Sequence, residues 1–146
     1  MSGTWKWYLS GKLAEAKGNI DWDVDTLKIM LTTSSYTPDQ ANHDYRDDVT
    51  NEVGASGTYS AGGGTITGVA VSKDTGSLEV RYLWDDLSFT GATITARTAV
   101  LYKSRGGAAS ADELIAYCTE SADVSSTAST FTVDVPATSV LKVTVS

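Results

Sequence analysis

Apolar and polar residues alternate along much of the chain from residue 26 onward, which is the pattern of half-buried β-strands. The segment 26–32 is the first example, with Leu27, Ile29 and Leu31 on one face. Runs with the same two-residue period recur between segments whose residues favour turns. The further strands that this pattern predicts are 65–72, 77–84, 93–103, 113–119, 129–135 and 139–145, with 87–89 as a short additional strand.

The strands 65–72 and 77–84 predict a β-hairpin. The spacer between them is Lys73-Asp74-Thr75-Gly76, in which Gly76 suits a left-handed conformation. Gly68 interrupts the alternation of the first strand, as a β-bulge does. The second strand has one apolar face that we expect to point into the core, formed by Leu78, Val80, Tyr82 and Trp84.

Strands of this number and spacing predict an all-β fold, an antiparallel β-sandwich of jelly-roll-like type. A closed barrel is the alternative. The length of 146 residues fits a single domain, 1–146, with a core large enough to need no disulfide or metal. The residues that we expect to be buried are Leu31, Tyr82, Trp84, Val100, Phe131 and Val143.

A helical pattern is confined to residues 5–17. Thr4 is a candidate N-cap and Gly18 a candidate C-terminal residue, whereas Gly11 weakens the helix. The apolar positions recur at spacings of three and four, which predicts a face packed on the core, and they are Trp5, Tyr8 or Leu9, Leu13 and Ala16.

The segment 36–64 has little periodicity, many polar groups and three consecutive glycines. A long irregular segment inside a compact domain is usually functional or partly disordered. We therefore expect contacts with partners here and in the N-terminal aromatic stretch. The candidate anchors are Trp5, Trp7, Tyr36 and Tyr45, because aromatic residues dominate interface hot spots. An equally good interpretation of Trp5 is that it packs the short helix onto the sheet.

The formal net charge of −7 argues against a protein that binds nucleic acid or an anionic membrane. The single cysteine, Cys118, excludes an internal disulfide and a cysteine-based zinc site, and the single histidine, His43, excludes a multi-histidine metal centre. No stretch of about 18 apolar residues occurs, and the first residues lack the apolar region of a signal peptide. We expect a soluble protein that folds in a reducing cytoplasm.

A catalytic site would need His43 as a general base, oriented by Asp44, Asp47 or Asp48. No Gly-x-Ser-x-Gly motif supplies a nucleophile, and Ser139-Val140-Leu141-Lys142 matches Ser-x-x-Lys without the companion motifs. Asp21, Asp23 and Asp25 alternate as calcium ligands often do, but the glycine and distal glutamate of an EF-hand loop are missing. We expect no catalytic, cofactor-binding or metal-binding residue.

Several stretches together resemble a family of small virion proteins of tailed bacteriophages. The resemblance covers nearly the whole chain, from Trp5 to the last strand. The stretches that carry it are 25–38, His43-Asp44-Tyr45, Asp47-Asp48-Val49, Asn51-Glu52-Val53, 59–63 and 92–103.

Among phage structural proteins, a single β-domain of this size resembles capsid decoration (cement) proteins. Those proteins sit as dimers or trimers on the outer shell and clamp neighbouring major capsid subunits. The resemblance implies a homo-oligomer on the head surface of the virion, made in the host bacterial cytoplasm, with the major capsid protein as its partner. The alternatives are a tail- or baseplate-associated receptor- or glycan-binding domain and a free carbohydrate-binding module.

Overall fold

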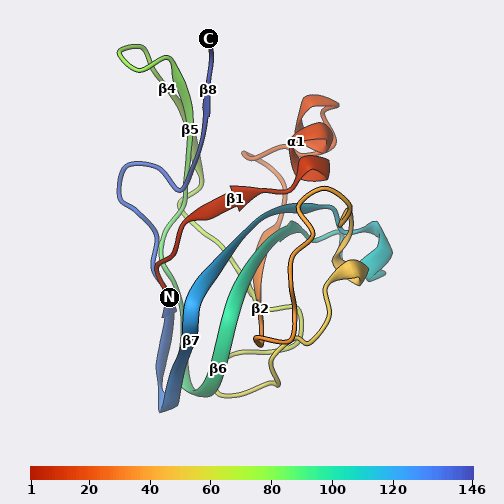
Figure 1. Ribbon diagram of the computed structural model, residues 1–146, viewed down its shortest axis with the longest axis vertical. Coiled ribbons are helices and arrows are strands. Elements are labelled where there is room, and N and C mark those ends of the chain that lie inside the picture. Colours follow the sequence, from red (N-terminus) through yellow and green to blue (C-terminus); the bar gives the residue numbers. More distant parts are fainter.

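A computed structural model describes residues 1–146 as two antiparallel β-sheets and one short α-helix (Figure 1). The five-stranded sheet has the order β1-β7-β6-β2-β3, and the three-stranded sheet has the order β4-β5-β8. The predicted all-β class with an N-terminal helix is confirmed, and the two sheets are separate rather than one closed barrel. The strands are β1 (Trp5–Trp7), β2 (Leu27–Thr32), β3 (Gly64–Thr65), β4 (Ala70–Asp74), β5 (Glu79–Leu83), β6 (Leu87–Lys103), β7 (Leu114–Val133) and β8 (Leu141–Thr144). The helices are α1 (Leu9–Ala16) and the 3-10 turns η1 (Arg46–Asp48) and η2 (Ala109–Ala111).

β6 and β7 are long single strands, where the sequence predicts two shorter strands each. Thr90-Gly91, whose residues favour a turn between the predicted strands 87–89 and 93–103, is a bulge, at which the pairing register shifts and Gly91 takes a φ of 62°. Ser125-Ser126, between the predicted strands 113–119 and 129–135, lies inside β7, where the Ser125 hydroxyl is 2.9 Å from the Thr95 hydroxyl of β6. Serine and threonine suit exposed strand faces as well as turns, so composition alone does not separate the two.

The predicted helix 5–17 is wrong at its start. Trp5–Trp7 form the strand β1, which pairs with the edge of β7 so that Trp5 lies opposite Cys118. The N-cap of α1 is Tyr8 rather than Thr4. Strand pairing overrides the helical pattern here, because the edge of β7 offers backbone partners that an isolated helical turn does not.

α1 turns its small residues, and not its leucines, toward the sheet. Gly11 and Ala14 are buried, and a Cβ atom on Gly11 would lie 2.5 Å from the carbonyl oxygen of Ile115 in β7. Leu9 and Leu13 are 65% and 53% exposed. The prediction that this apolar face packs on the core is therefore wrong for Leu9, Leu13 and Ala16, although Trp5 and Tyr8 are buried. Only glycine allows the helix to lie this close to β7.

The β4–β5 hairpin forms, but its turn differs from the prediction. Leu78 takes the left-handed conformation, with a φ of 54°, and is 61% exposed instead of core-facing. Gly68 is not a bulge within a strand. It lies in a bend with a φ of 64° between β3 and β4, where the chain leaves the five-stranded sheet for the three-stranded one.

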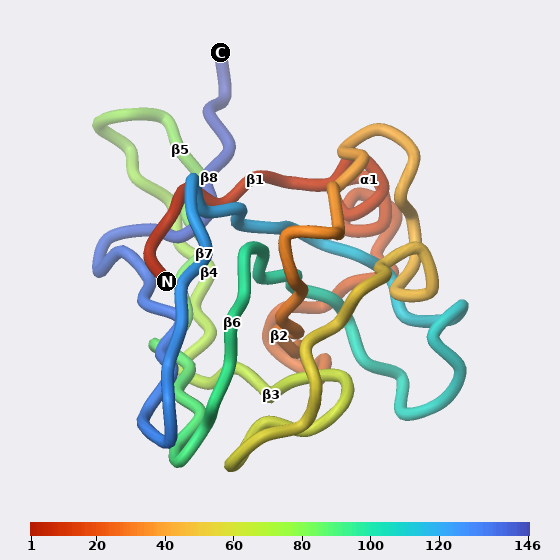
Figure 2. Tube along the Cα trace, turned by 60° about the horizontal axis from the view of Figure 1, so that its bottom comes forward, coloured from red at the N-terminus to blue at the C-terminus, as the bar shows by residue number.

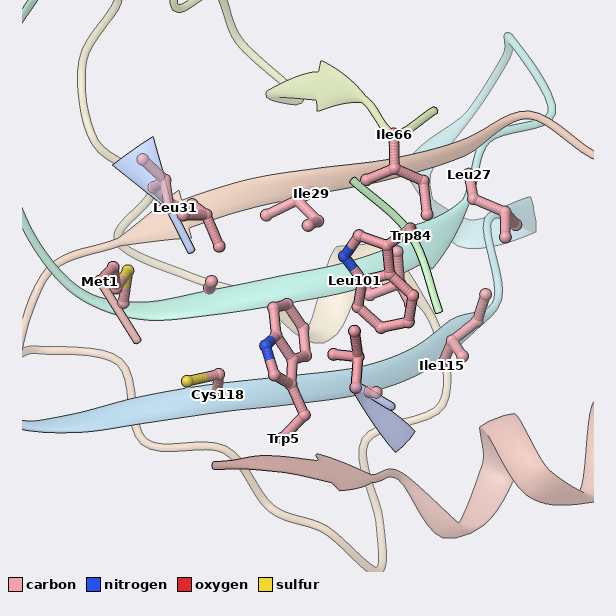
Figure 3. Packing of buried hydrophobic residues seen from close by; sticks show 14 of the residues in the cluster. Met1, Trp5, Leu27, Ile29, Leu31, Ile66, Trp84, Leu101, Ile115 and Cys118 are labelled. Atoms are coloured by element: carbon pink, nitrogen blue, oxygen red, sulfur yellow. The ribbon is translucent and has the colours of Figure 1, made fainter. Parts of the chain in front are cut away.

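The larger core lies between the two sheets (Figure 3). Of the residues predicted to be buried, it contains Leu31, Tyr82, Trp84 and Phe131, whereas Val143 is only half-buried at its edge. Cys118 also belongs to this core. The other members include Trp5, Trp22, Leu27, Ile29, Ile66, Phe89, Leu101 and Ile115.

A second core covers the opposite face of the five-stranded sheet, and the sequence pattern does not predict it. Residues 33–63, here called the cover segment, place Tyr36 and Val49 on this face, whereas Val53 and Tyr59 of the same segment pack into the larger core. The segment 36–64 is thus largely a layer of the fold. The members of this core are Tyr8, Met30, Tyr36, Val100, Tyr102, Leu114 and Tyr117.

The three glycines 62–64 hold the end of the cover segment against β2. Gly63 has a φ of 75°, and a Cβ atom there would lie 1.8 Å from the carbonyl oxygen of Ile29. No other residue type fits this approach of two backbones. The Tyr102 hydroxyl donates a 2.6 Å hydrogen bond to the carbonyl oxygen of Gly62, which fixes the segment from the other side.

Truncation of Trp84 tests the core between the sheets. Its side chain is 1% exposed, so Trp84→Ala should lower the free energy of unfolding by about 3–5 kcal/mol. Urea denaturation followed by circular dichroism measures this loss. Val24, which is 80% exposed, provides the control: Val24→Ala should be nearly neutral.

Gly11→Ala tests the close approach of α1 to β7. Alanine normally stabilises a helix relative to glycine by roughly 0.5–1 kcal/mol. Here the added Cβ atom meets the backbone of Ile115, so we expect a net loss of about 1–3 kcal/mol. Gly54→Ala, at a position with open space around it, should change unfolding little. A stabilised Gly11→Ala variant in the same urea titration would contradict the packing described here.

Candidate functional site

All four tryptophans gather in one cluster that joins the two sheets. Trp5 of β1 meets Trp84 edge to face at 5.3 Å between ring centroids. Trp22 stacks on Trp84 at 6.2 Å, and Trp7 lies edge to face against Trp22 at 6.0 Å. Tyr82 of β5 completes the cluster, 5.0 Å from Trp7. The rings therefore pack on one another instead of forming a surface row.

Two charged residues of α1 close this cluster. Glu15 accepts hydrogen bonds from the indole N–H of Trp22 at 2.7 Å and from the Tyr82 hydroxyl at 2.8 Å. Lys12 forms an ion pair with Glu15 at 2.5 Å and lies 4.8 Å from the centroid of the Trp7 ring. Burial lowers the pKa of Lys12, but the hydrogen bonds to Glu15 and Tyr82 outweigh it and leave this pKa raised. α1 is thus tied to the three-stranded sheet.

The structure separates the four candidate anchors. Trp5 is 6% exposed and Tyr36 is 4% exposed, so neither presents a surface to a partner. Trp7 is half-buried, with Lys12 over its ring. Tyr45 is 42% exposed and remains the only accessible aromatic residue among the four. The interpretation of Trp5 as a packing residue is the one that its burial favours.

The His43 ring is held by other residues of the cover segment and not by the side chains of Asp44, Asp47 or Asp48. Its Nδ1 atom is 3.0 Å from the Tyr36 hydroxyl and accepts a hydrogen bond from the backbone N–H of Asp39 at 3.2 Å. The Tyr36 hydroxyl in turn lies 2.8 Å from that of Tyr8, whose pKa burial raises strongly. Asp48 instead accepts the backbone N–H groups of residues 44 and 45.

Two of the three alternating aspartates near β2 make side-chain contacts within the fold. Asp25 forms an ion pair with Lys103 at 2.8 Å and accepts the backbone N–H of Asp21. Asp21 accepts the backbone N–H of Asp23. Nowhere in the structure do three or more His, Cys, Asp or Glu side chains converge in a way that could hold a metal ion.

Two adjoining hollows border the exposed side of α1, on either side of Leu9. The first, of about 440 Å³, lies between α1 and β8 and is lined by Trp7, Tyr8, Leu9, Lys12, Gln40, Ala41 and Val143. The second, of about 300 Å³, lies between α1 and the cover segment and is lined by Leu9, Ser10, Leu13, Ala14, Lys17, Asn19, Ala41, Asp44, Tyr45 and Glu113. Figure 2 shows the cover segment running beside α1.

We call the exposed apolar residues around the second hollow the α1 surface: Leu9, Leu13, Ala16, Ala41 and Tyr45. Ala16 and Ala41 are also exposed. Leu9, Leu13 and Ala16 follow one another at helical spacing and form a continuous stripe. Soluble monomers rarely expose contiguous apolar patches without a binding role, so the α1 surface is the best candidate for contact with another protein.

The charges at the second hollow are of two kinds. Glu113 is engaged by Arg105 in an ion pair at 2.5 Å. Lys17, at the C-terminal end of α1, and Asp44, on the opposite wall, are exposed and form no ion pair within the chain. The hollow thus offers one free cation and one free anion beside its leucines.

A buried ion pair fixes the wall that carries Tyr45. Asp112 is 1% exposed and accepts a 2.8 Å hydrogen bond from the guanidinium of Arg46. The same guanidinium lies 5.3 Å from the centroid of the Tyr102 ring. The backbone around Tyr45 also pairs with that of Glu113. The wall is therefore held on rigid elements instead of a free loop, and Tyr45 keeps its position.

The comparisons with known proteins give no relative. No family model matches the chain, and neither the curated proteins nor the solved structures contain a match. No helix in the structure is long and apolar enough to cross a membrane.

Sequence reasoning reached part of this surface. It marked Leu9, Leu13 and Tyr45, but it placed the two leucines in the core. It did not find Lys17 or Asp44 as members of the same site. The one indication in the sequence was Gly11. A helix that packs closely against a sheet through a glycine turns the leucines on its other side outward.

Asp48 makes the cover segment sensitive to acid. The backbone N–H of Asp44 holds the pKa of the Asp48 carboxyl below its ordinary value, although partial burial raises it, and the N–H of Tyr45 lowers it further. A lowered folded-state pKa contributes stability at neutral pH that is lost as the pH falls through that value. Amide hydrogen exchange should therefore show that residues 44 and 45 lose protection below about pH 4.

Asp48→Asn is the control for this prediction. The amide side chain does not titrate, so protection of the two backbone N–H groups should then be independent of pH in the same range. Equal loss of protection in Asp48→Asn and in the unchanged protein would show that another group causes it.

Proposed function

We propose that this protein is a bacteriophage virion structural protein, and within that class a homo-oligomeric decoration (cement) protein of the head. It is made in the host bacterial cytoplasm, binds the outer capsid surface and stabilises the shell by clamping neighbouring copies of the major capsid protein. This role involves no catalysis and no cofactor. The starting point is the resemblance to small phage virion proteins over stretches such as 25–38 and 92–103.

The burial of the aromatic rings is the observation that carries this proposal over glycan binding. A glycan-binding domain presents two or three exposed rings as a stacking platform. Here Tyr45 is the single exposed aromatic residue, Trp7 is half-buried and all others are buried. A cement protein needs no platform, because it acts through contact area repeated at many symmetric positions.

Two further properties support contact with protein at high copy number. The α1 surface exposes Leu9 and Leu13 beside the hollows described above. The net charge of −7 keeps densely packed copies on a shell from attracting further particles. It also disfavours direct contact with the packaged nucleic acid.

The position of the protein in purified particles tests the proposal most directly. Antibodies against the protein, visualised by electron microscopy of the phage that encodes it, should label the head surface. Label confined to the tail or baseplate would instead favour a receptor- or glycan-binding domain.

Particles made without the protein should assemble, yet release DNA at a lower temperature and after milder osmotic shock than complete particles. The reason is that the shell loses the contacts that bridge neighbouring capsid subunits. DNA release is followed with an intercalating dye during heating, and adding the purified protein back should restore the original temperature. If the depleted particles are as robust as complete ones but fail to adsorb to host cells, the tail-binding alternative is the better account.

A further inference from the structure

The apolar stripe of α1 lacks a partner within its own chain. Leu9 and Leu13 are one helical turn apart and are 65% and 53% exposed, whereas Gly11 and Ala14 make the contact with β7. The stripe borders the second hollow, whose other wall carries Tyr45. Burial of a leucine side chain is worth about 1.5–3 kcal/mol, so this stripe is a source of binding energy that the single chain does not use.

The charges beside the stripe indicate which occupant fits it. Lys17 and Asp44 both line the second hollow, lie on opposite walls of it and have no partner in the chain. A surface with an apolar centre, one free cation and one free anion is complementary to itself. In a two-fold contact residue i of one copy meets residue j of the other, and j meets i.

We propose that the α1 surface is a two-fold interface that binds the α1 surface of a second copy of this chain. The two α1 helices run antiparallel, so that Leu9 of one copy packs near Leu13 of the other. Lys17 of each copy pairs with Asp44 of its partner copy. Tyr45 lies at this contact and is covered by it.

The helical spacing supports this arrangement. Residues at i and i+4 on an antiparallel pair of helices exchange places under a two-fold axis, so two equal side chains at these positions match each other. Leu9 and Leu13 are such a pair. Lys17 follows Leu13 by four residues, so its charge lies at the C-terminal end of the same row of side chains. A different partner protein with charges of only one sign would pair with either Lys17 or Asp44 and would leave the other without a partner.

This inference concerns the chain alone, and it does not depend on the proposed role on a phage head. A dimer in solution would stand even if the protein were found on the tail. Conversely, a monomer that coats the head would overturn the dimer and the homo-oligomeric state, but it would leave the binding to the capsid surface intact.

Sedimentation velocity of the purified protein tests the interface. The unchanged protein should sediment as a monomer–dimer equilibrium over about 1–200 µM, as expected for a contact of modest area. Leu13→Asp should weaken association at least about ten-fold, because it places a charge in the apolar centre. Leu78→Asp is the matched control, since Leu78 is a leucine of similar exposure in the turn between β4 and β5, and it should leave association unchanged.

Charge reversal gives a second, independent measurement. Lys17→Glu alone faces Asp44 with a like charge, and Asp44→Lys alone faces Lys17 with one, so each variant should sediment as a monomer. Mixed in equal amounts, the two variants should form a heterodimer. One of its two ion pairs is the original Lys17–Asp44 pair, and the other has the two charges exchanged. Both substitutions are at exposed positions, and circular dichroism verifies the fold.

Four results would overturn the proposal. Three of them are a monomer at every concentration, a trimer as the associated species, and association that Leu13→Asp leaves intact. A mixture of the two charge-reversed variants that stays monomeric, although the unchanged protein dimerises, would place the dimer contact on another surface and overturn it as well.

Discussion

The burial of the five-stranded sheet on both of its faces is the constraint on which the rest of the structure depends. One face packs against the three-stranded sheet through residues such as Leu31 and Leu101. The other face packs through Val100 and Tyr102 against Tyr36 of the cover segment. An irregular segment can cover a sheet only if its own backbone groups are satisfied. The hydrogen bond from the backbone N–H of Arg46 to the carbonyl oxygen of Asp112 and the bonds to Asp48 supply part of that requirement.

The packing of the aromatic residues follows from the same constraint. Each sheet layer needs large side chains, and the tryptophans fill the junction between the two sheets. Glu15 and Lys12 of α1 then complete the junction from outside. Because the rings are used in this way, little aromatic surface is left for a ligand, which favours the proposed contact between proteins over glycan binding.

α1 connects the architecture to that function. Its position is set by Gly11, which lets the helix lie against the backbone of β7. A helix so close to the sheet buries its small residues and leaves Leu9 and Leu13 outside. The exposed apolar stripe is therefore a consequence of the packing, and the free charges of Lys17 and Asp44 lie beside it.

The sequence by itself determined the fold class, most strand positions and much of the larger core. A two-residue period reports which residues share a face, as it does for Leu27, Ile29 and Leu31, and it needs no knowledge of distant segments. The tertiary structure alone decided that 5–7 form a strand, because this depends on the free edge of β7, which lies more than 100 residues away in the chain. It also decided which side of α1 faces outward. Local periodicity marks an apolar stripe, but whether another layer covers that stripe depends on how closely the backbones approach, and a single glycine decided it here.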